Sequence, residues 1–276
     1  MKKRNWLIPA CAVLFLGACT EDEQAVEQPP TEETQAAEAS QDEAAEEAEE
    51  NKEVIDQAEE EAAVEVSYRL NPQNSKLEPI NEANEQVVLM TIDDAPSTYA
   101  LEMAGILKEH DVPAIFFVNG HFLSTEEEQE TLTEIHEMGF AIGNHTNTHV
   151  NLKQSSEAVQ EQEIVLLNET VEAIIGEAPR FFRAPFGVNT EYSNALVEEL
   201  GMVRMNWTYG YDFMQGYMEK EALADIMVNA PELNNGGNLL MHDREWTKDA
   251  LPEIIEGLRD KGFEFVDPDE IEGIQP

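Results

Sequence analysis

Short apolar segments alternate with longer segments of helical pattern from near Ser67 onward, and this pattern constrains the fold more than any other feature. Apolar runs separated by helix-length segments are typical of parallel strands joined by crossover helices. Gly139, Gly201 and Gly262 each stand between a helical segment and the next apolar run, where a helix end favours glycine. We therefore predict an α/β fold, a sheet or barrel of parallel strands. The predicted strands are 87–92, 114–118, 141–144, 181–183, 202–207, 238–241 and 263–266, and the predicted helices are 98–110, 125–138, 155–175, 191–200, 219–230 and 248–261.

Reactive side chains follow the ends of these predicted strands. The carboxyl ends of parallel strands gather on one face of an α/β barrel, where active sites are built. We therefore expect these residues to meet in space. In chain order they are Asp93 and Asp94 after the first strand, His145 and His149 after the third, Arg183 at the end of the fourth, Asp212 after the fifth, and His242 and Asp243 after the sixth.

Two of these pairs are candidates for holding a metal ion. His145 and His149 are four residues apart, and on a helical turn they would share a face. That spacing is also common among unrelated surface histidines. Asp93 and Asp94 follow a buried strand, so one could bind metal while the other accepts a proton, although an aspartate before a helix is often only an N-cap. Two histidines and one carboxylate leave positions open for water and substrate, as catalytic metal sites require.

Arg183 and His242 each allow two interpretations. Arg183 ends an apolar strand in a chain with few cations, which favours a buried carboxylate partner over a solvent-exposed position. His242 follows a buried-type strand, so it is either part of the site or a histidine satisfied within the core.

The two cysteines, Cys11 and Cys19, both lie near the start of the chain. The predicted folded part therefore has no disulfide, no zinc–thiolate site and no cysteine nucleophile. Any metal there must be held by His, Asp or Glu.

The N-terminus has the pattern of a secretion signal. A positive start of Lys2, Lys3 and Arg4 precedes an apolar stretch that is too short to span a bilayer comfortably. The stretch ends in Leu-Gly-Ala-Cys19, which resembles the lipobox of bacterial lipoproteins. The resemblance implies a signal peptide over residues 1–19 and lipidation of Cys19. An ordinary cleaved signal and an uncleaved anchor are the alternatives.

The segment 20–66 is dominated by Glu, Ala, Gln and Asp, and we predict a disordered acidic linker before a folded domain over 67–276. The whole chain has a formal net charge of -42, from 16 Lys and Arg against 58 Asp and Glu. Such a charge repels nucleic acid and anionic lipid surfaces, and it favours a neutral glycan or another neutral substrate over a polyanion.

The polar clusters, in this order, resemble the motifs of the polysaccharide deacetylases of carbohydrate esterase family 4, which share the NodB homology domain. The resemblance covers about residues 85–267, and five motifs in order are far more specific than any one. The matching segments are Thr91–Ala95, His145–His149, Arg183–Gly187, Asp212 with Phe213, and Leu240–His242.

The resemblance implies a distorted (β/α) barrel of about seven parallel strands that holds a divalent metal ion. The expected ligands are Asp94, His145 and His149, and the metal is usually zinc, with Co²⁺, Mn²⁺ or Ni²⁺ as alternatives. Asp93 would be the general base, held in place by Arg183.

The remaining implied roles concern the leaving group and the acetyl pocket. His242, oriented by Asp212, would protonate the departing amine. Leu240 and Phe213 would line the acetyl pocket, and a backbone N–H near Phe186 would stabilise the oxyanion.

Two positions depart from the family pattern. Ala95 stands where glycine is usual, and a positive φ there would cost alanine about 1 kcal/mol or shift the loop. Phe213 replaces a common tryptophan and reshapes a pocket wall. We expect both changes to affect substrate preference more than the hydrolytic reaction itself.

The leading functional hypothesis is a lipid-anchored, monomeric N-acetylglucosamine deacetylase on the outer side of the cell membrane, facing the wall and acting on peptidoglycan. Deacetylation of chitooligosaccharide or poly-N-acetylglucosamine is the second hypothesis. The third is a non-catalytic wall-binding relative, which would be expected to have lost one of the site residues.

Overall fold

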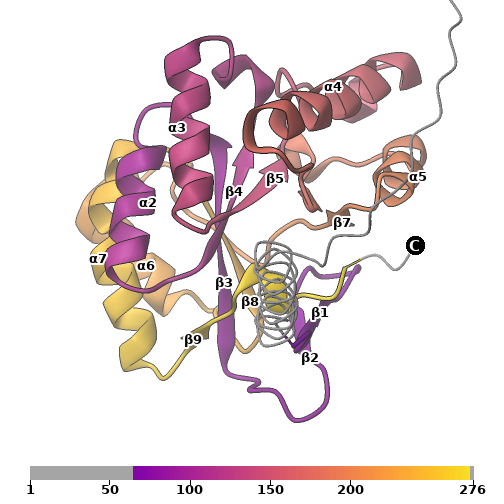
Figure 1. The fold of residues 1–276 in the computed structure, drawn as a ribbon. Coiled ribbons are helices and arrows are strands. Elements are labelled where there is room, and N and C mark those ends of the chain that lie inside the picture. Colours follow the sequence, from indigo (N-terminus) through magenta and orange to yellow (C-terminus); the bar gives the residue numbers. More distant parts are fainter. Residues whose placement is uncertain (1–64, 274–276) are drawn as a thin grey trace, which may run out of the picture. The chain divides into compact units, whose positions relative to one another are not determined.

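The computed structural model describes residues 65–273, and a curled parallel sheet forms the centre of this domain (Figure 1). Its strand order is β7-β6-β5-β4-β3-β8, and β9 pairs with the start of β3. The predicted signal peptide, Cys19 and nearly all of the predicted linker lie outside the described residues. The strands are β3 (Val87–Ala95), β4 (Ala114–Val118), β5 (Ala141–Asn144), β6 (Phe181–Phe182), β7 (Val203–Arg204), β8 (Gly237–His242) and β9 (Glu264–Phe265).

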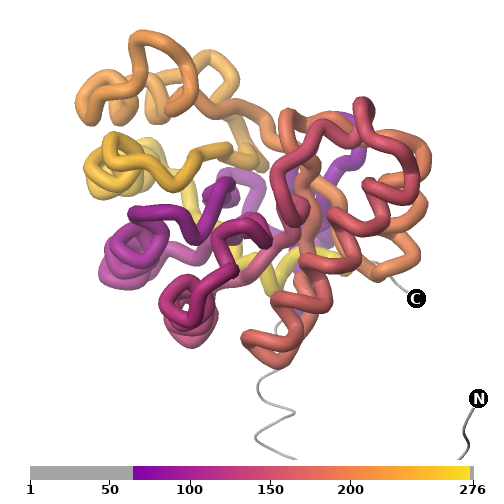
Figure 2. The backbone as a smooth tube through the Cα atoms, turned by 90° about the horizontal axis from the view of Figure 1, so that it is seen from above, coloured from indigo at the N-terminus to yellow at the C-terminus, as the bar shows by residue number. Residues whose placement is uncertain are grey.

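Helices connect the strands and cover the outside of the sheet, as the view in Figure 2 shows. Local sequence fixes several of their ends. Thr125 and Glu128 form a capping box at the start of α3, and Gly176 ends α4 with a left-handed φ of 85°. The helices are α2 (Ala100–Glu109), α3 (Glu126–Glu137), α4 (Glu157–Ile175), α5 (Glu191–Glu199), α6 (Lys220–Asn229) and α7 (Glu245–Asp260).

Alternate side chains of β3 pack on opposite faces of the sheet. Val88 and Met90 belong to the large core under the outer helices, whereas Val87 and Leu89 belong to a second core inside the curl. Burial of both faces explains why the strands are continuous apolar runs instead of alternating ones. Each fully buried aliphatic side chain contributes about 1.5–3 kcal/mol to this packing.

A small antiparallel pair of strands adds to the inner core. The strands are β1 (Tyr68–Leu70) and β2 (Leu77–Pro79), and both Tyr68 and Leu77 belong to the inner cluster. The sequence analysis did not predict this pair, because three-residue strands carry too little periodicity to be recognised.

A segment without regular structure links the two edges of the sheet. The Met205 N–H donates to the carbonyl of Phe182 at the end of β6, while the Thr208 N–H donates to the carbonyl of Asn238 in β8. Gly210 then passes so close to β8 that an added Cβ would collide with the Leu240 carbonyl. The segment therefore brings the ends of β6 and β8 to the same cavity.

The predicted fold class is confirmed: the domain is a curled parallel α/β half-barrel, and each predicted strand and helix is present. The predicted strand 202–207 is shorter than expected because its second half crosses to β8. Gly139, Gly201 and Gly262 have the expected positive φ values. None of the helices in 65–273 is both long and apolar enough to cross a membrane.

Candidate metal and catalytic site

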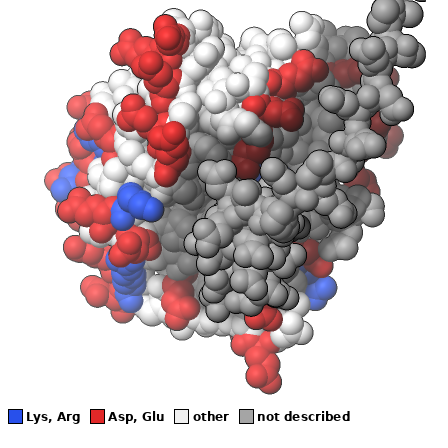
Figure 3. Space-filling model, in the orientation of Figure 1, with Lys and Arg blue, Asp and Glu red and all other residues white. Residues whose placement is uncertain are grey.

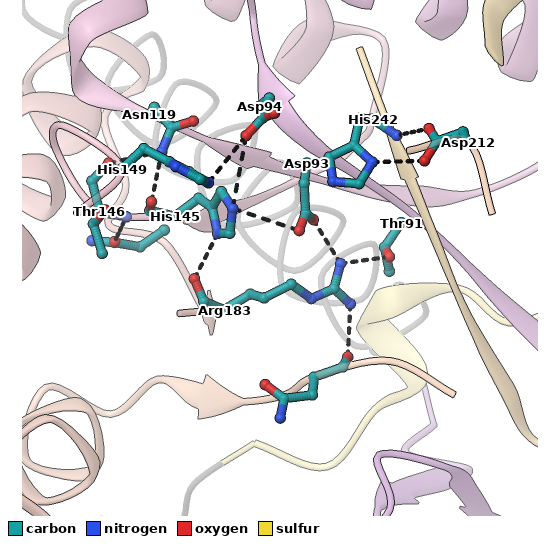
Figure 4. Close-up of polar contacts among 12 residues, drawn as sticks. Thr91, Asp93, Asp94, Asn119, His145, Thr146, His149, Arg183, Asp212 and His242 are labelled. Atoms are coloured by element: carbon teal, nitrogen blue, oxygen red, sulfur yellow. Dashed lines mark hydrogen bonds and ion pairs between the residues drawn. The ribbon is translucent and has the colours of Figure 1, made fainter. Parts of the chain in front are cut away.

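The first two site residues extend from the carboxyl end of the central strand, β3. Asp93 is buried, and its Oδ1 accepts a hydrogen bond of 2.6 Å from Nη1 of Arg183. The same Nη1 donates to Thr91, and Nη2 donates to the Asn206 carbonyl at 2.8 Å (Figure 4). Arg183 is fully buried and lies over the ring of Phe117, 4.3 Å from its centroid. The buried carboxylate partner expected for Arg183 is therefore Asp93.

Asp94 faces the two histidines of the predicted triad. Its Oδ1 lies 3.5 Å from Nε2 of His149 and 3.9 Å from Nε2 of His145. One donor atom from each of the three residues can be chosen so that all lie within 4.8 Å of one another. The other oxygen of Asp93, Oδ2, lies 3.6 Å from Nε2 of His145. The structure thus brings the expected ligands together and places the second aspartate beside them (Figure 4).

The protonation states of Asp94 and His145 suit metal binding. Burial alone would raise the pKa of Asp94, but positively charged neighbours, His242 first and Arg244 among them, outweigh it and the pKa lies below the ordinary value. Burial lowers the pKa of His145 and keeps its imidazole neutral. The His145 Nδ1 lies 2.7 Å from the Arg183 carbonyl, which can only accept, so Nδ1 carries the proton and Nε2 is left as a ligand. Two imidazole nitrogens and one carboxylate form a donor set that suits zinc.

The two histidines lie in a loop after β5, not on the helical turn considered in the sequence analysis. Thr146 and His149 have positive φ values of 67° and 58°. Asp94 and Phe186, both at the same site, have values of 61°. This conformation is uncommon for non-glycine residues, and four of the seven such residues within 65–273 lie at this site.

Side chains from neighbouring elements hold this loop. Asn119, after β4, donates from Nδ2 to the carbonyls of His145 and Thr146 at 2.6 and 3.1 Å. Glu163 on α4 is largely buried, and it accepts hydrogen bonds from the Thr148 N–H at 2.7 Å and the Thr148 hydroxyl at 2.6 Å. The loop between the two imidazoles is therefore clamped from two sides.

His242, at the end of β8, is paired with Asp212. Its Nδ1 lies 2.8 Å from Asp212 Oδ1, and its backbone N–H donates to Oδ2 at 2.6 Å. Asp212 is fully buried and also accepts from the hydroxyl of Thr247. Burial lowers the pKa of His242, but the hydrogen bond and charge of Asp212, with Asp93 and Asp94, outweigh it, so the pKa is raised. The imidazole is therefore able to hold a proton near neutral pH.

Asp93, Asp94, the two loop histidines and His242 line one cavity of about 380 Å³. The wall positions predicted from the sequence are present: Leu240 is buried, while Phe186 and Phe213 are 62% and 49% exposed at the mouth. Trp207 is a further wall that the sequence analysis missed. The complete lining is Asp93, Asp94, His145, His149, Phe186, Trp207, Phe213, Leu240, His242 and Arg244.

Two more contributors follow His242 directly in the sequence. Asp243 is buried and accepts from the backbone N–H groups of Ser97, Thr98 and Tyr99, which ties the turn after Asp94 to β8. Arg244 donates from Nη2 to Asp94 Oδ2 at 2.9 Å. The position of Asp243 and Arg244 directly after His242 is a sequence feature that could have identified both. No sequence feature of α4 distinguishes Glu163 from the other acidic residues of that helix.

The residue at the glycine position of the first motif, Ala95, does not have a positive φ; Asp94 does. The strain considered for alanine therefore does not arise. Ala95 is fully buried, and its carbonyl accepts from the Asn119 N–H at 3.0 Å.

Known proteins resemble this domain in sequence and in fold. Residues 80–205 match the family model for polysaccharide deacetylase. A peptidoglycan-N-acetylglucosamine deacetylase of Bacillus cereus is 29% identical over 196 residues, which cover 67% of this chain and 70% of that protein. A chitooligosaccharide deacetylase of Bradyrhizobium is 26% identical over 198 residues, covering 64% of this chain and 87% of that protein.

A solved structure of a carbohydrate esterase family 4 pseudoenzyme from Bacillus anthracis matches with a TM-score of 0.61 at 27% identity, covering 68% of this chain and 65% of that one. The residues assigned to the motifs from the sequence are all present in this chain: Asp93, Asp94, His145, His149, Arg183 and His242. The folded domain is thus a polysaccharide deacetylase domain of carbohydrate esterase family 4, and the chain is a hydrolase of that family, which acts on carbon–nitrogen bonds other than peptide bonds.

Proposed function

We propose that this chain is a metal-dependent deacetylase that hydrolyses the N-acetyl groups of N-acetylglucosamine in cell-wall peptidoglycan. The observation that carries the proposal is the convergence of Asp94, His145 and His149 beside a second, separately held aspartate. The peptidoglycan deacetylase of Bacillus cereus supports the substrate class.

The donor set fits a divalent ion, and we propose zinc, held by Asp94, His145 and His149. A divalent ion there would supply a positive charge that polarises the acetamide carbonyl and makes water more acidic. Asp93 is fixed at Oδ1 by Arg183, so Oδ2 is the oxygen that takes the proton from the attacking water.

The leaving amine needs a proton, and we assign its donation to His242. Because Nδ1 of His242 is committed to Asp212, the other ring nitrogen, Nε2, is the one left for the substrate. The raised pKa keeps that proton available near neutral pH. Leu240 and Trp207 form apolar walls that suit an acetyl methyl group, while Phe186 and Phe213 offer ring faces to the sugar.

Acetate release from purified wall glycan tests the proposal, with and without a chelator. We expect acetate release to stop when a chelator is added and to resume when Zn²⁺ is restored. The same assay on chitin oligomers tests the second candidate, which the chitooligosaccharide deacetylase of Bradyrhizobium favours. No acetate from either substrate by the metal-loaded chain would contradict the proposal.

We further propose that Cys19 carries a lipid that anchors the chain to the outer face of the membrane, with residues 20–66 as a spacer toward the wall. This rests on the sequence alone. Replacing Cys19 by alanine should move the protein from the membrane fraction to the medium. We also propose a monomer, which light scattering of the purified chain would check.

A further inference from the structure

Arg244 is a cation in the wall of the cavity that the proposed reaction does not use. Its Nη1 donates to the Asp243 carbonyl and its Nη2 to Asp94 Oδ2, both at 2.9 Å. Asp243 is itself fixed by three backbone N–H groups. The guanidinium is therefore held in one orientation, although its side chain is 39% exposed.

The contact with Asp94 accounts for only part of Arg244. It places a positive charge beside the Asp94 carboxylate and helps to lower its pKa. Because the Arg244 side chain is 39% exposed, its ion pair with Asp94 contributes little to the stability of the fold. Stability therefore gives little reason for an arginine at this position.

Arg244 also has hydrogen-bonding capacity left over. A guanidinium carries five N–H donors, and two of them make the bonds described above. Within residues 65–273 the others have no protein partner, and Arg244 is the one Lys or Arg that lines this cavity. The free donors of a planar, pre-oriented guanidinium are suited to a carboxylate.

The acidic character of the chain makes a cation in the cavity wall informative about the substrate. The chain carries a formal charge of -42, and acidic side chains predominate on the face shown in Figure 3 outside its grey atoms. An anionic ligand is repelled by such a surface unless the pocket offers a local positive group. A neutral oligosaccharide needs no such group.

On the basis of the proposed function, we propose that Arg244 is a specificity-determining residue that binds a carboxylate next to the acetylated sugar. The substrate class is then an anionic N-acetylated glycan, such as wall glycan whose sugars bear lactyl and peptide carboxylates. Neutral chitin-type polymers would lack this contact.

The test compares two substrates of similar length: a wall-glycan fragment with free carboxylates and a chitin tetramer. The variants are Arg244→Ala and Arg244→Lys in the full chain. Lys248→Ala is the matched control, because it removes one positive charge from α7 at a residue that pairs with Glu102 and lies outside the cavity. The measured quantity is the ratio of kcat/KM for the two substrates.

We expect Arg244→Ala to lower the preference for the carboxylated fragment by about tenfold or more, mainly through KM, since a charge-assisted contact is lost. Arg244→Lys should restore part of it, and Lys248→Ala should leave the ratio unchanged. An unchanged ratio in Arg244→Ala, whether both activities fall together or neither falls, would overturn the proposal.

Zn²⁺ affinity of the metal-stripped variants, measured by calorimetry, separates specificity from an effect through Asp94. We expect Arg244→Ala still to bind one Zn²⁺ per chain, although loss of the bond to Asp94 can weaken that binding, so the kinetic ratio is measured at saturating Zn²⁺. Loss of Zn²⁺ binding would instead make Arg244 a positioning residue. Wild-type chain that releases acetate from neither substrate contradicts the proposed function, whereas an active wild type with an unchanged ratio contradicts only the role of Arg244.

Discussion

The floor and the rim of the cavity are built differently. At the floor, Asp93 and, behind His242, Asp212 are buried, and each accepts a hydrogen bond from a buried side chain. On the rim, Phe186, Phe213 and Arg244 are substantially exposed. A buried, fully bonded group holds one geometry, whereas an exposed one adapts and is easily exchanged. We infer that the floor sets the reaction and the rim sets which glycan is accepted.

The largest effect is expected on the floor, from Asp93→Asn. The asparagine oxygen still accepts from Arg183, so the fold and the triad should persist, but the side chain no longer takes a proton. We expect a fall in kcat of about a thousandfold, within the range for a lost general base. Steady-state acetate release measures it, with Zn²⁺ affinity as the control. Substantial activity would remove Asp93 from its assigned role.

The next largest effect, on metal affinity, is expected from Glu163, which holds the loop between His145 and His149. Glu163→Ala leaves the Thr148 N–H without its partner and should loosen the link between His145 and His149. Zn²⁺ affinity should fall about 10- to 100-fold, as for lost outer-shell contacts. Glu161→Ala is the control, since Glu161 is exposed on the same helix and bonds only to the Tyr192 hydroxyl. Equal affinities for both variants would show that the loop does not depend on α4.

The pairing of His242 with Asp212 predicts a change in the pH dependence of activity. The pKa of His242 is raised, so its protonated form persists to higher pH and activity should decline as pH rises through that value. Asp212→Asn removes the charge that raises the pKa most, which should move the alkaline limb of the kcat profile to lower pH. If the alkaline limb stays at the same pH in Asp212→Asn, the limb reports the titration of a group other than His242.

The rim should give the smallest effect. Phe213→Trp restores the residue that is common in the family and should change KM for a given glycan by a few fold with little change in kcat, because the ring touches substrate and not the reacting atoms. Kinetics on wall fragments and chitin oligomers check this. A large loss of kcat would mean that the rim contributes to the chemistry as well.

The sequence predicted the residues at the strand ends better than those that support the loops or complete the cavity wall, and the reason is physical. Asp93, His145, Arg183 and His242 all directly follow or end apolar strands, and strand order alone brings such positions to one face. Trp207 lies in the irregular segment that crosses to β8, and Glu163 is one acidic residue among many on α4. Their roles depend on three-dimensional contacts that neither periodicity nor motif spacing encodes. The left-handed backbone of Asp94 and His149 likewise had no local signal, since neither is glycine.

The central claim is that Asp94, His145 and His149 bind one metal ion. Calorimetric titration of Zn²⁺ into the metal-stripped full chain tests it most directly, with His145→Ala alongside. We predict one tightly bound ion per wild-type chain and no comparable binding in the variant. Wild-type affinity in His145→Ala, or no binding in the wild type, would contradict the account.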